Sequence, residues 1–188
     1  MDIKEYTLSI FTENKIGLLQ RLSTIFTKRK INLDSFNASE SEVKDVYRFT
    51  IVIQTTEDQV KKVTKQIEKQ IGVLKAFYHE VSEIVYQEIA LYKVSTKALS
   101  QGSDVEEIIR KHNARILTVE PDYVIIEKTG HKAGTQELFE KLHPFGMLQF
   151  VRSGRVAVTK QIKEITSYLR DLEEASKHSE QELLLLNL

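Results

Sequence analysis

The stretch TENKIGLLQRLSTIF, residues 12–26, joins two different hydrophobic patterns. Before it, Tyr6, Leu8 and Ile10 alternate with polar residues, which indicates a strand. After Gly17 the apolar residues recur at i, i+4, i+7 and i+8, as on one face of an amphipathic helix; they are Leu18, Leu22, Ile25 and Phe26. The stretch therefore predicts a strand that passes into a helix, with Gly17 at the junction.

The residues that follow extend this pattern to a unit of four strands and two helices. Residues 31–36 and 46–55 predict two more strands, the second rich in β-branched and aromatic residues. A second helix can be capped by Thr55 or Thr56 and ends at Gly72; its apolar face consists of Val60, Val63, Ile67 and Ile71. Residues 73–79 predict a fourth strand, so the order is β-α-β-β-α-β.

The same order is predicted again in the second half. Residues 88–96 predict a strand, Val105, Ile108 and Ile109 a helix, and residues 114–130 two strands about a Pro-Asp turn. A second helix follows at Leu138, Phe139 and Leu142, and residues 147–159 predict one bulged strand or a pair. The expected fold class is α+β, with two tandem ferredoxin-like units, 1–80 and 81–160.

A helical tail is expected over residues 161–188, outside both units. Ile162, Ile165, Leu169 and Leu172 have helical spacing, and the chain ends in the apolar run ELLLLNL. Such a segment is either a docking element or a frayed tail, and the sequence leaves both open.

The composition excludes several classes of protein. The 188 residues include 27 Lys or Arg and 27 Asp or Glu, so no net charge favours nucleic acid or an acidic membrane. Cysteine is absent, which excludes disulfides and thiolate zinc sites. Since the N-terminus lacks the basic-then-apolar order of a signal peptide and no apolar run is long enough to span a bilayer, we expect a soluble, cytoplasmic protein.

No catalytic constellation or metal site is predicted. The five histidines are scattered without ligand spacing, and neither the P-loop nor the dinucleotide-binding glycine motif occurs. A split-βαβ sheet can bind RNA, but the aromatic stacking signature of that class is missing.

Gly17 marks a candidate anion site. The first turn of a helix has unpaired N–H groups and partial positive charge, and glycine lets a ligand approach closely. With Asn14 nearby, such a site suits the carboxylate and ammonium groups of an amino acid. The alternative is that Gly17 only forms a tight turn and Asn14 is a loop or cap residue.

Residues 11–36 resemble the first strand, loop, helix and strand of ACT domains, small regulatory modules that bind amino acids. The resemblance is closest to the regulatory (small) subunit of acetolactate synthase, also called acetohydroxyacid synthase. Residues 13–19 match its loop E-N-x-x-G-x-L, residues 32–35 its N-[IL]-[ED]-S, and residues 47–51 its S-R-[MF]-T-I with Tyr47 in place of serine. Segments 87–94, 115–130 and 150–160 are similar to its later motifs, so the resemblance covers about residues 3–160.

The resemblance implies a non-catalytic regulatory subunit. Such a chain binds a catalytic subunit that carries thiamine diphosphate, Mg and FAD, raises its activity, and lets a branched-chain amino acid, usually valine, inhibit it. It would have no cofactor of its own and would form a homodimer through the ACT domains, with the effector between them. Ile16 stands where a small residue or Pro is common, which bears on the choice of effector.

The expected effector contacts follow from the same motifs. Backbone N–H groups near Gly17 and Leu18 would bind the carboxylate, and Asn14 and Asn32 the polar head across the dimer interface, while two aliphatic residues would contact the side chain. The full set is Asn14, Ile16, Gly17, Leu18, Asn32 and Leu33.

Two other classes stay open on the sequence alone. One is a stand-alone amino-acid sensor or co-regulator built from ACT-like units; the lack of a helix-turn-helix and of a basic surface counts against it. The other is an enzyme on a ferredoxin-like fold; the missing acid/base cluster counts against that.

Overall fold

The computed structural model describes residues 2–97 and 104–161. The tail predicted over residues 161–188 therefore lies, except for its first residue, outside the described residues.

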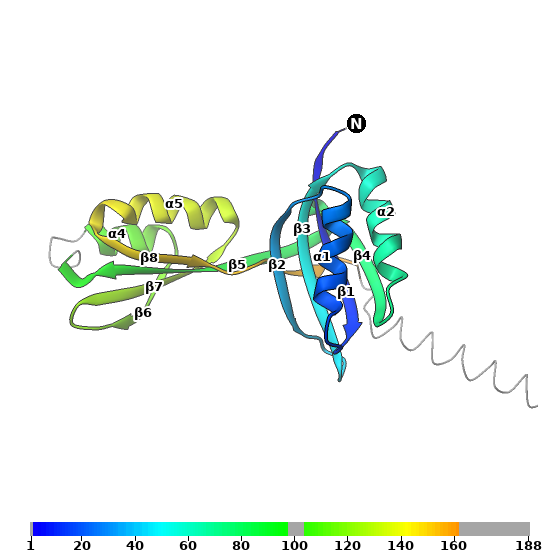
Figure 1. Cartoon of the computed structure of the whole chain (residues 1–188). Helices are drawn as coiled ribbons and strands as arrows, with labels where there is room; N and C mark the ends of the chain where they lie inside the picture. Colours follow the sequence, from blue (N-terminus) through cyan, green and yellow to red (C-terminus); the bar gives the residue numbers. More distant parts are fainter. Residues whose placement is uncertain (1, 98–103, 162–188) are drawn as a thin grey trace, which may run out of the picture. The chain divides into compact units, whose positions relative to one another are not determined.

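The N-terminal unit is an antiparallel sheet with two helices on one face (Figure 1). The strand order is β2-β3-β1-β4, so β1 is central and β2 and β4 are the two edges. The elements, in chain order, are β1 (Lys4–Glu13), α1 (Leu18–Lys28), β2 (Leu33–Glu40), β3 (Val46–Thr55), α2 (Glu57–Glu68) and β4 (Val73–Glu80). The predicted β-α-β-β-α-β order is confirmed.

The helices of this unit form where the sequence predicts them. Leu18, Leu22, Ile25 and Phe26 of α1 are all buried against the sheet. Thr56 caps α2, its hydroxyl accepting a hydrogen bond from the Gln59 N–H at 3.4 Å.

The prediction that Ile71 belongs to the apolar face of α2 is wrong. The helix ends at Glu68, and the chain turns out of it through Gly72 at φ 90°. Ile71 therefore lies in the turn, where its side chain is 77% exposed. The apolar spacing in the sequence continues to Ile71, but the helix has already ended at Glu68 and the chain turns at Gly72.

The C-terminal unit repeats the arrangement with one additional strand (Figure 1). Its strand order is β6-β7-β5-β8, with β9 also paired to β5, and α4 and α5 cover one face. A short helix, η1 (Val81–Glu83), ends the N-terminal unit. The elements that follow are β5 (Ile84–Ser95), α4 (Asp104–Lys111), β6 (Arg115–Val119), β7 (Tyr123–Gly130), α5 (Lys132–Leu142), η2 (His143–Phe145), β8 (Met147–Arg152) and β9 (Val156–Thr159). The fold class, two tandem ferredoxin-like units, is confirmed.

The contacts divide the chain at Ile84, close to the predicted boundary between residues 80 and 81. Two short segments group with the other unit than the one in which their neighbours in the chain lie. Ser35–Asn37 of β2 group with the C-terminal unit, and residues 159–161 group with the N-terminal unit. No helix within residues 2–97 and 104–161 is long and apolar enough to cross a membrane.

Tyr92 is the largest buried side chain of the C-terminal core. It is fully buried in the middle of β5, and its hydroxyl donates a hydrogen bond to the Thr135 carbonyl at 2.6 Å. Burial raises the pKa of the Tyr92 hydroxyl to about 12, against a smaller opposing effect of the Arg152 charge.

We expect this raised pKa to make the C-terminal unit less stable in alkali. Below pH 10 tyrosine is neutral in both states, so its protonation adds no pH dependence. Between pH 10 and 12 the unfolded chain loses the proton first, and the free energy of unfolding should fall by about 1 kcal/mol at pH 11. Urea denaturation at pH 8 and pH 11 measures it. The Tyr92→Phe variant, which has no hydroxyl to titrate, should lose less; an equal loss would assign the effect to other groups.

Candidate functional site

The loop between β1 and α1 has a defined backbone geometry. Gly17 is the N-cap of α1 with φ 81° and ψ −2°, a left-handed conformation that favours glycine. The loop is held by backbone hydrogen bonds from Glu13 N to Gly72 O at 2.9 Å and from Lys15 N to Glu13 O at 3.0 Å. An ion pair also joins the Lys15 and Glu13 side chains. Gly17 is therefore a turn residue, as the alternative interpretation of the sequence predicts, and it is also the N-cap of α1.

The N-terminus of α1 has neither a capping side chain nor an acidic residue in its first turn, and there is free space beside Gly17. The first helical hydrogen bond runs from Arg21 N to Gly17 O at 3.2 Å, so the N–H groups of Leu19 and Gln20 precede the bonded turns. A Cβ atom on Gly17 would meet nothing within 4 Å. These groups can receive an anion without moving any neighbour.

The structure places the predicted loop residues at this opening, with one distinction. Asn14 is exposed, and the Ile16 side chain is fully exposed. The Leu18 side chain is only 2% exposed and belongs to the core, and its N–H lies 3.4 Å from the Lys15 carbonyl oxygen. Leu18 can therefore face a ligand only through its backbone.

Asn32 and Leu33 lie at the other end of α1. Both are exposed and stand where the chain leaves the helix and enters the edge strand β2. Helix α1 has 11 residues, which corresponds to about 16 Å of rise. A molecule as small as an amino acid cannot touch both ends of α1 in one chain. The structure thus separates the two halves of the predicted site.

Leu19 is a loop neighbour that the predicted set does not include. It lies three residues after Ile16 and its side chain is 50% exposed. Together Ile16 and Leu19 present an aliphatic pair beside the open end of α1. The loop motif over residues 13–19 ends on Leu19, and that was the signal in the sequence.

Arg48, from the motif over residues 47–51, contacts residues of the sheet rather than the loop between β1 and α1. It lies opposite Phe11 on the neighbouring strand, with its guanidinium 5.5 Å from the ring centroid. Its Nη2 donates a hydrogen bond to the Ser9 hydroxyl at 3.1 Å, and burial lowers the pKa of Arg48.

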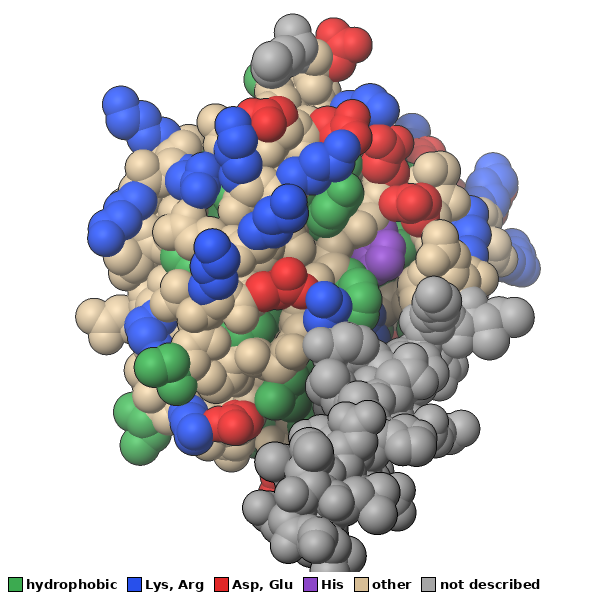
Figure 2. Space-filling model, turned by 90° about the vertical axis from the view of Figure 1, so that its right-hand side faces the viewer, with side chains coloured by type: hydrophobic (Ala, Val, Ile, Leu, Met, Phe, Trp, Pro, Cys, Tyr) green, Lys and Arg blue, Asp and Glu red, His purple; other side chains and the backbone are tan. Residues whose placement is uncertain are grey.

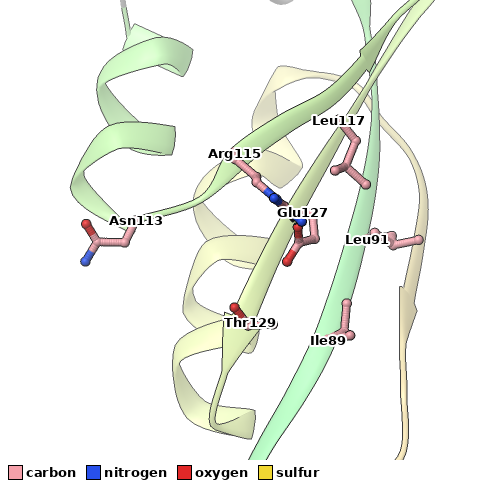
Figure 3. A pocket seen from close by; sticks show the side chains of 7 residues that line it. All are labelled: Ile89, Leu91, Asn113, Arg115, Leu117, Glu127 and Thr129. Carbon is pink, nitrogen blue, oxygen red and sulfur yellow. Dashed lines mark hydrogen bonds and ion pairs between the residues drawn. The ribbon is translucent and has the colours of Figure 1, made fainter.

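A hollow of about 610 Å³ lies on the C-terminal sheet (Figure 3). Arg115 of β6 and Glu127 of β7 form an ion pair in it, with aliphatic side chains from β5 alongside. Its lining residues are Ile89, Leu91, Asn113, Arg115, Leu117, Glu127 and Thr129. The predicted site residues do not include this face; the signal was the consecutive apolar run of residues 89–92 in β5, which places apolar side chains on both faces of the strand. The pair is satisfied, so the hollow offers a contact surface rather than a reactive group.

Within residues 2–97 and 104–161, no three His, Cys, Asp or Glu side chains lie where they could hold a metal ion together.

Two family models match the two units separately. Residues 8–75 match the model described as an AHAS small subunit-like ACT domain, and residues 87–161 match the model described as the small subunit of acetolactate synthase. Together they cover most of the chain, and the second is specific to one family. The chain belongs to the acetolactate synthase small-subunit family.

Individual relatives agree with this assignment. The acetolactate synthase small subunit of Mycobacterium bovis is 33% identical over 160 residues, which cover 85% of this chain and 95% of the relative. The corresponding protein of Bacillus subtilis is 32% identical over 161 residues, covering 85% and 93%. The crystal structure of the small subunit from Thermotoga maritima has the same fold, with a TM-score of 0.77 at 23% identity, covering 85% of this chain and 99% of that one.

Proposed function

We propose that this chain is the regulatory subunit of an acetolactate synthase, and that a branched-chain amino acid, valine above all, binds at the N-terminus of α1 as feedback inhibitor. The active site, with thiamine diphosphate, Mg and FAD, would lie on the catalytic subunit in the cytoplasm. The observation that carries the proposal is the open, uncapped N-terminus of α1 at Gly17 in a chain of this family.

The chemistry of the opening fits an aliphatic amino acid. The N–H groups of Leu19 and Gln20 and the positive end of the helix dipole suit a carboxylate. Asn14 can accept a hydrogen bond from an ammonium group. Ile16 and Leu19 supply exposed aliphatic surface for the effector side chain.

A homodimer would unite the two halves of the site. Strand β2 is an edge of the N-terminal sheet, and an edge strand can pair with its copy about a two-fold axis. In such an antiparallel pair, the end of α1 that carries Gly17 in one copy approaches the start of β2, with Asn32 and Leu33, in the other. The effector would then bind between two copies, which gives it a means to favour one quaternary arrangement.

Reconstitution tests this function. We expect the purified chain alone to show no turnover of pyruvate, because the proposal places catalysis on another subunit. Added to the catalytic subunit of the same host, it should raise turnover several-fold, and valine, leucine or isoleucine should then lower it. Calorimetry against the three amino acids identifies the effector.

Two results would count against the proposal. Pyruvate turnover by the chain alone would make it an enzyme. Effector binding without any influence on the catalytic subunit would make it a stand-alone amino-acid sensor of ACT type.

A further inference from the structure

A groove of about 580 Å³ runs between α2 and the edge strand β4 of the N-terminal unit. Figure 2 views the molecule from the side on which α2 lies, where Lys and Arg side chains gather with acidic and hydrophobic ones between them. Residues of β4 line one side of the groove, among them Ala76 and Tyr78, whose side chains lie on the same face of the strand. The loop between β1 and α1, where we propose that the effector binds, does not line the groove.

The chain is fastened at this groove where the described residues end. Lys160 N donates a hydrogen bond to the Glu83 carbonyl at 2.9 Å, and its Nζ donates to the Ser82 carbonyl at 2.7 Å. Glu83 lines the groove, and so does Gln161, the residue after Lys160. The described part of the chain therefore ends in the groove.

The segment after Gln161 has a composition that suits a groove with a basic wall. From Ile162 to Glu174 it contains four acidic and two basic residues. Lys61, Lys65 and Lys75 line the groove against two acidic residues. Lys61 and Lys75 are paired with Glu57 and Glu68, whereas within residues 2–97 and 104–161 Lys65 has no ion-pair partner.

The dimensions agree as well. The groove follows five residues of β4, Lys75–His79, which extend about 16 Å. A helix over residues 162–172 would also be about 16 Å long. Its apolar stripe would comprise Ile162, Ile165, Leu169 and Leu172. Among the described strands β4 pairs with β1 alone and is an edge of the sheet, and proteins usually cover such an edge.

We propose that residues 162–172 dock into the α2–β4 groove of their own chain and cover the β4 edge. The family model ends at residue 161, and the 160 residues matched in the M. bovis relative leave 15% of this chain outside the match. The docked segment is thus an addition of this chain to the family core.

Cross-linking tests the docking directly, because the natural sequence contains no cysteine. In the full chain, Lys65→Cys combined with Ile165→Cys should be joined within one molecule by a short bis-maleimide. Two matched pairs should react at least ten-fold more slowly. One replaces Ile165→Cys by Ser167→Cys, on the opposite side of the predicted helix; the other replaces Lys65→Cys by Lys62→Cys, exposed on α2 but outside the groove. Equal rates for all three pairs, or cross-links only between chains, would overturn the proposal.

Hydrogen exchange gives an independent readout. The amides of Lys75–His79 that do not bond to β1 should exchange at least ten-fold faster in a chain ending at Gln161 and in the double variant Ile165→Asp/Leu169→Asp. Ser167→Asp adds the same charge on the other side of the segment and should leave them unchanged. Unaltered exchange in the shortened chain would show that the groove is empty in the full chain. Neither readout depends on effector binding or on the catalytic subunit.

Discussion

Gly17→Asp should abolish inhibition of the reconstituted enzyme by valine while stimulation of the catalytic subunit persists. The aspartate carboxylate would occupy the N–H groups and the positive helix end that should receive the effector carboxylate, and would repel that carboxylate. A loss of roughly 1.5–3 kcal/mol corresponds to about a ten- to hundred-fold higher inhibitory concentration. The new Cβ has open space around it, so no clash accounts for the effect.

Backbone strain requires a control, because Gly17 has φ 81° and any L-residue there costs about 1–2 kcal/mol. Gly17→Asn has the same shape and the same strain as Gly17→Asp but no charge, and asparagine tolerates this conformation better than most residues. Turnover of pyruvate is measured against valine concentration for both variants. If Asn loses inhibition as completely as Asp, the loop shape matters rather than the charge. If the Asp variant is still inhibited at the wild-type concentration, the loop is only a turn.

Local pattern was sufficient to predict the elements of both units. Alternation in residues 6–10 and helical spacing from Leu18 act over short distances and give the observed strand and helix. The same is true of the two strands about Pro121-Asp122, which form β6 and β7. Ile71 shows the limit: the hydrophobic run continues past Glu68, but the backbone turn at Gly72 decides where the helix ends.

The candidate site was predictable in its parts and not in its assembly. The loop glycine and its place before a helix are local features, and the structure has them. That Asn32 and Leu33 lie at the far end of α1 depends on the length of the helix between them. Whether they meet Gly17 of a second copy is decided by an interface that no local pattern encodes.

Contacts between distant strands were beyond sequence reasoning altogether. The sequence predicts one bulged strand or a pair over residues 147–159, with no partner for the turn between them. In the structure Gly154 approaches the backbone of Phe36 in β2, more than a hundred residues earlier, and the Arg155 N–H donates a hydrogen bond to the Ser35 hydroxyl at 3.0 Å. A single glycine gives no indication of which backbone it lets approach.

Gly154→Ala should destabilise the C-terminal unit by roughly 1–3 kcal/mol, as expected for overpacking against rigid neighbours. A Cβ at this position would lie 2.5 Å from the Phe36 carbonyl oxygen and 2.9 Å from its carbonyl carbon. Both are backbone atoms, so neither can rotate away. The turn cannot easily retreat, because Arg155 is 3% exposed with its guanidinium 3.7 Å from the centre of the Tyr86 ring. The midpoint of urea unfolding measures the loss.

Gly134→Ala is the matched control, since it makes the same substitution in the same unit. Gly134 lies inside α5, where the nearest atom to a new Cβ is the flexible end of Lys128 at 3.6 Å. Alanine favours helix over glycine, so this variant should be unchanged or more stable by roughly 0.5–1 kcal/mol. Opposite shifts of the two midpoints would show that Gly154 is needed for close backbone approach. If Gly154→Ala is as stable as the wild type, the Gly154–Phe36 contact must open without cost, and the grouping of Ser35–Asn37 with the C-terminal unit is then loose.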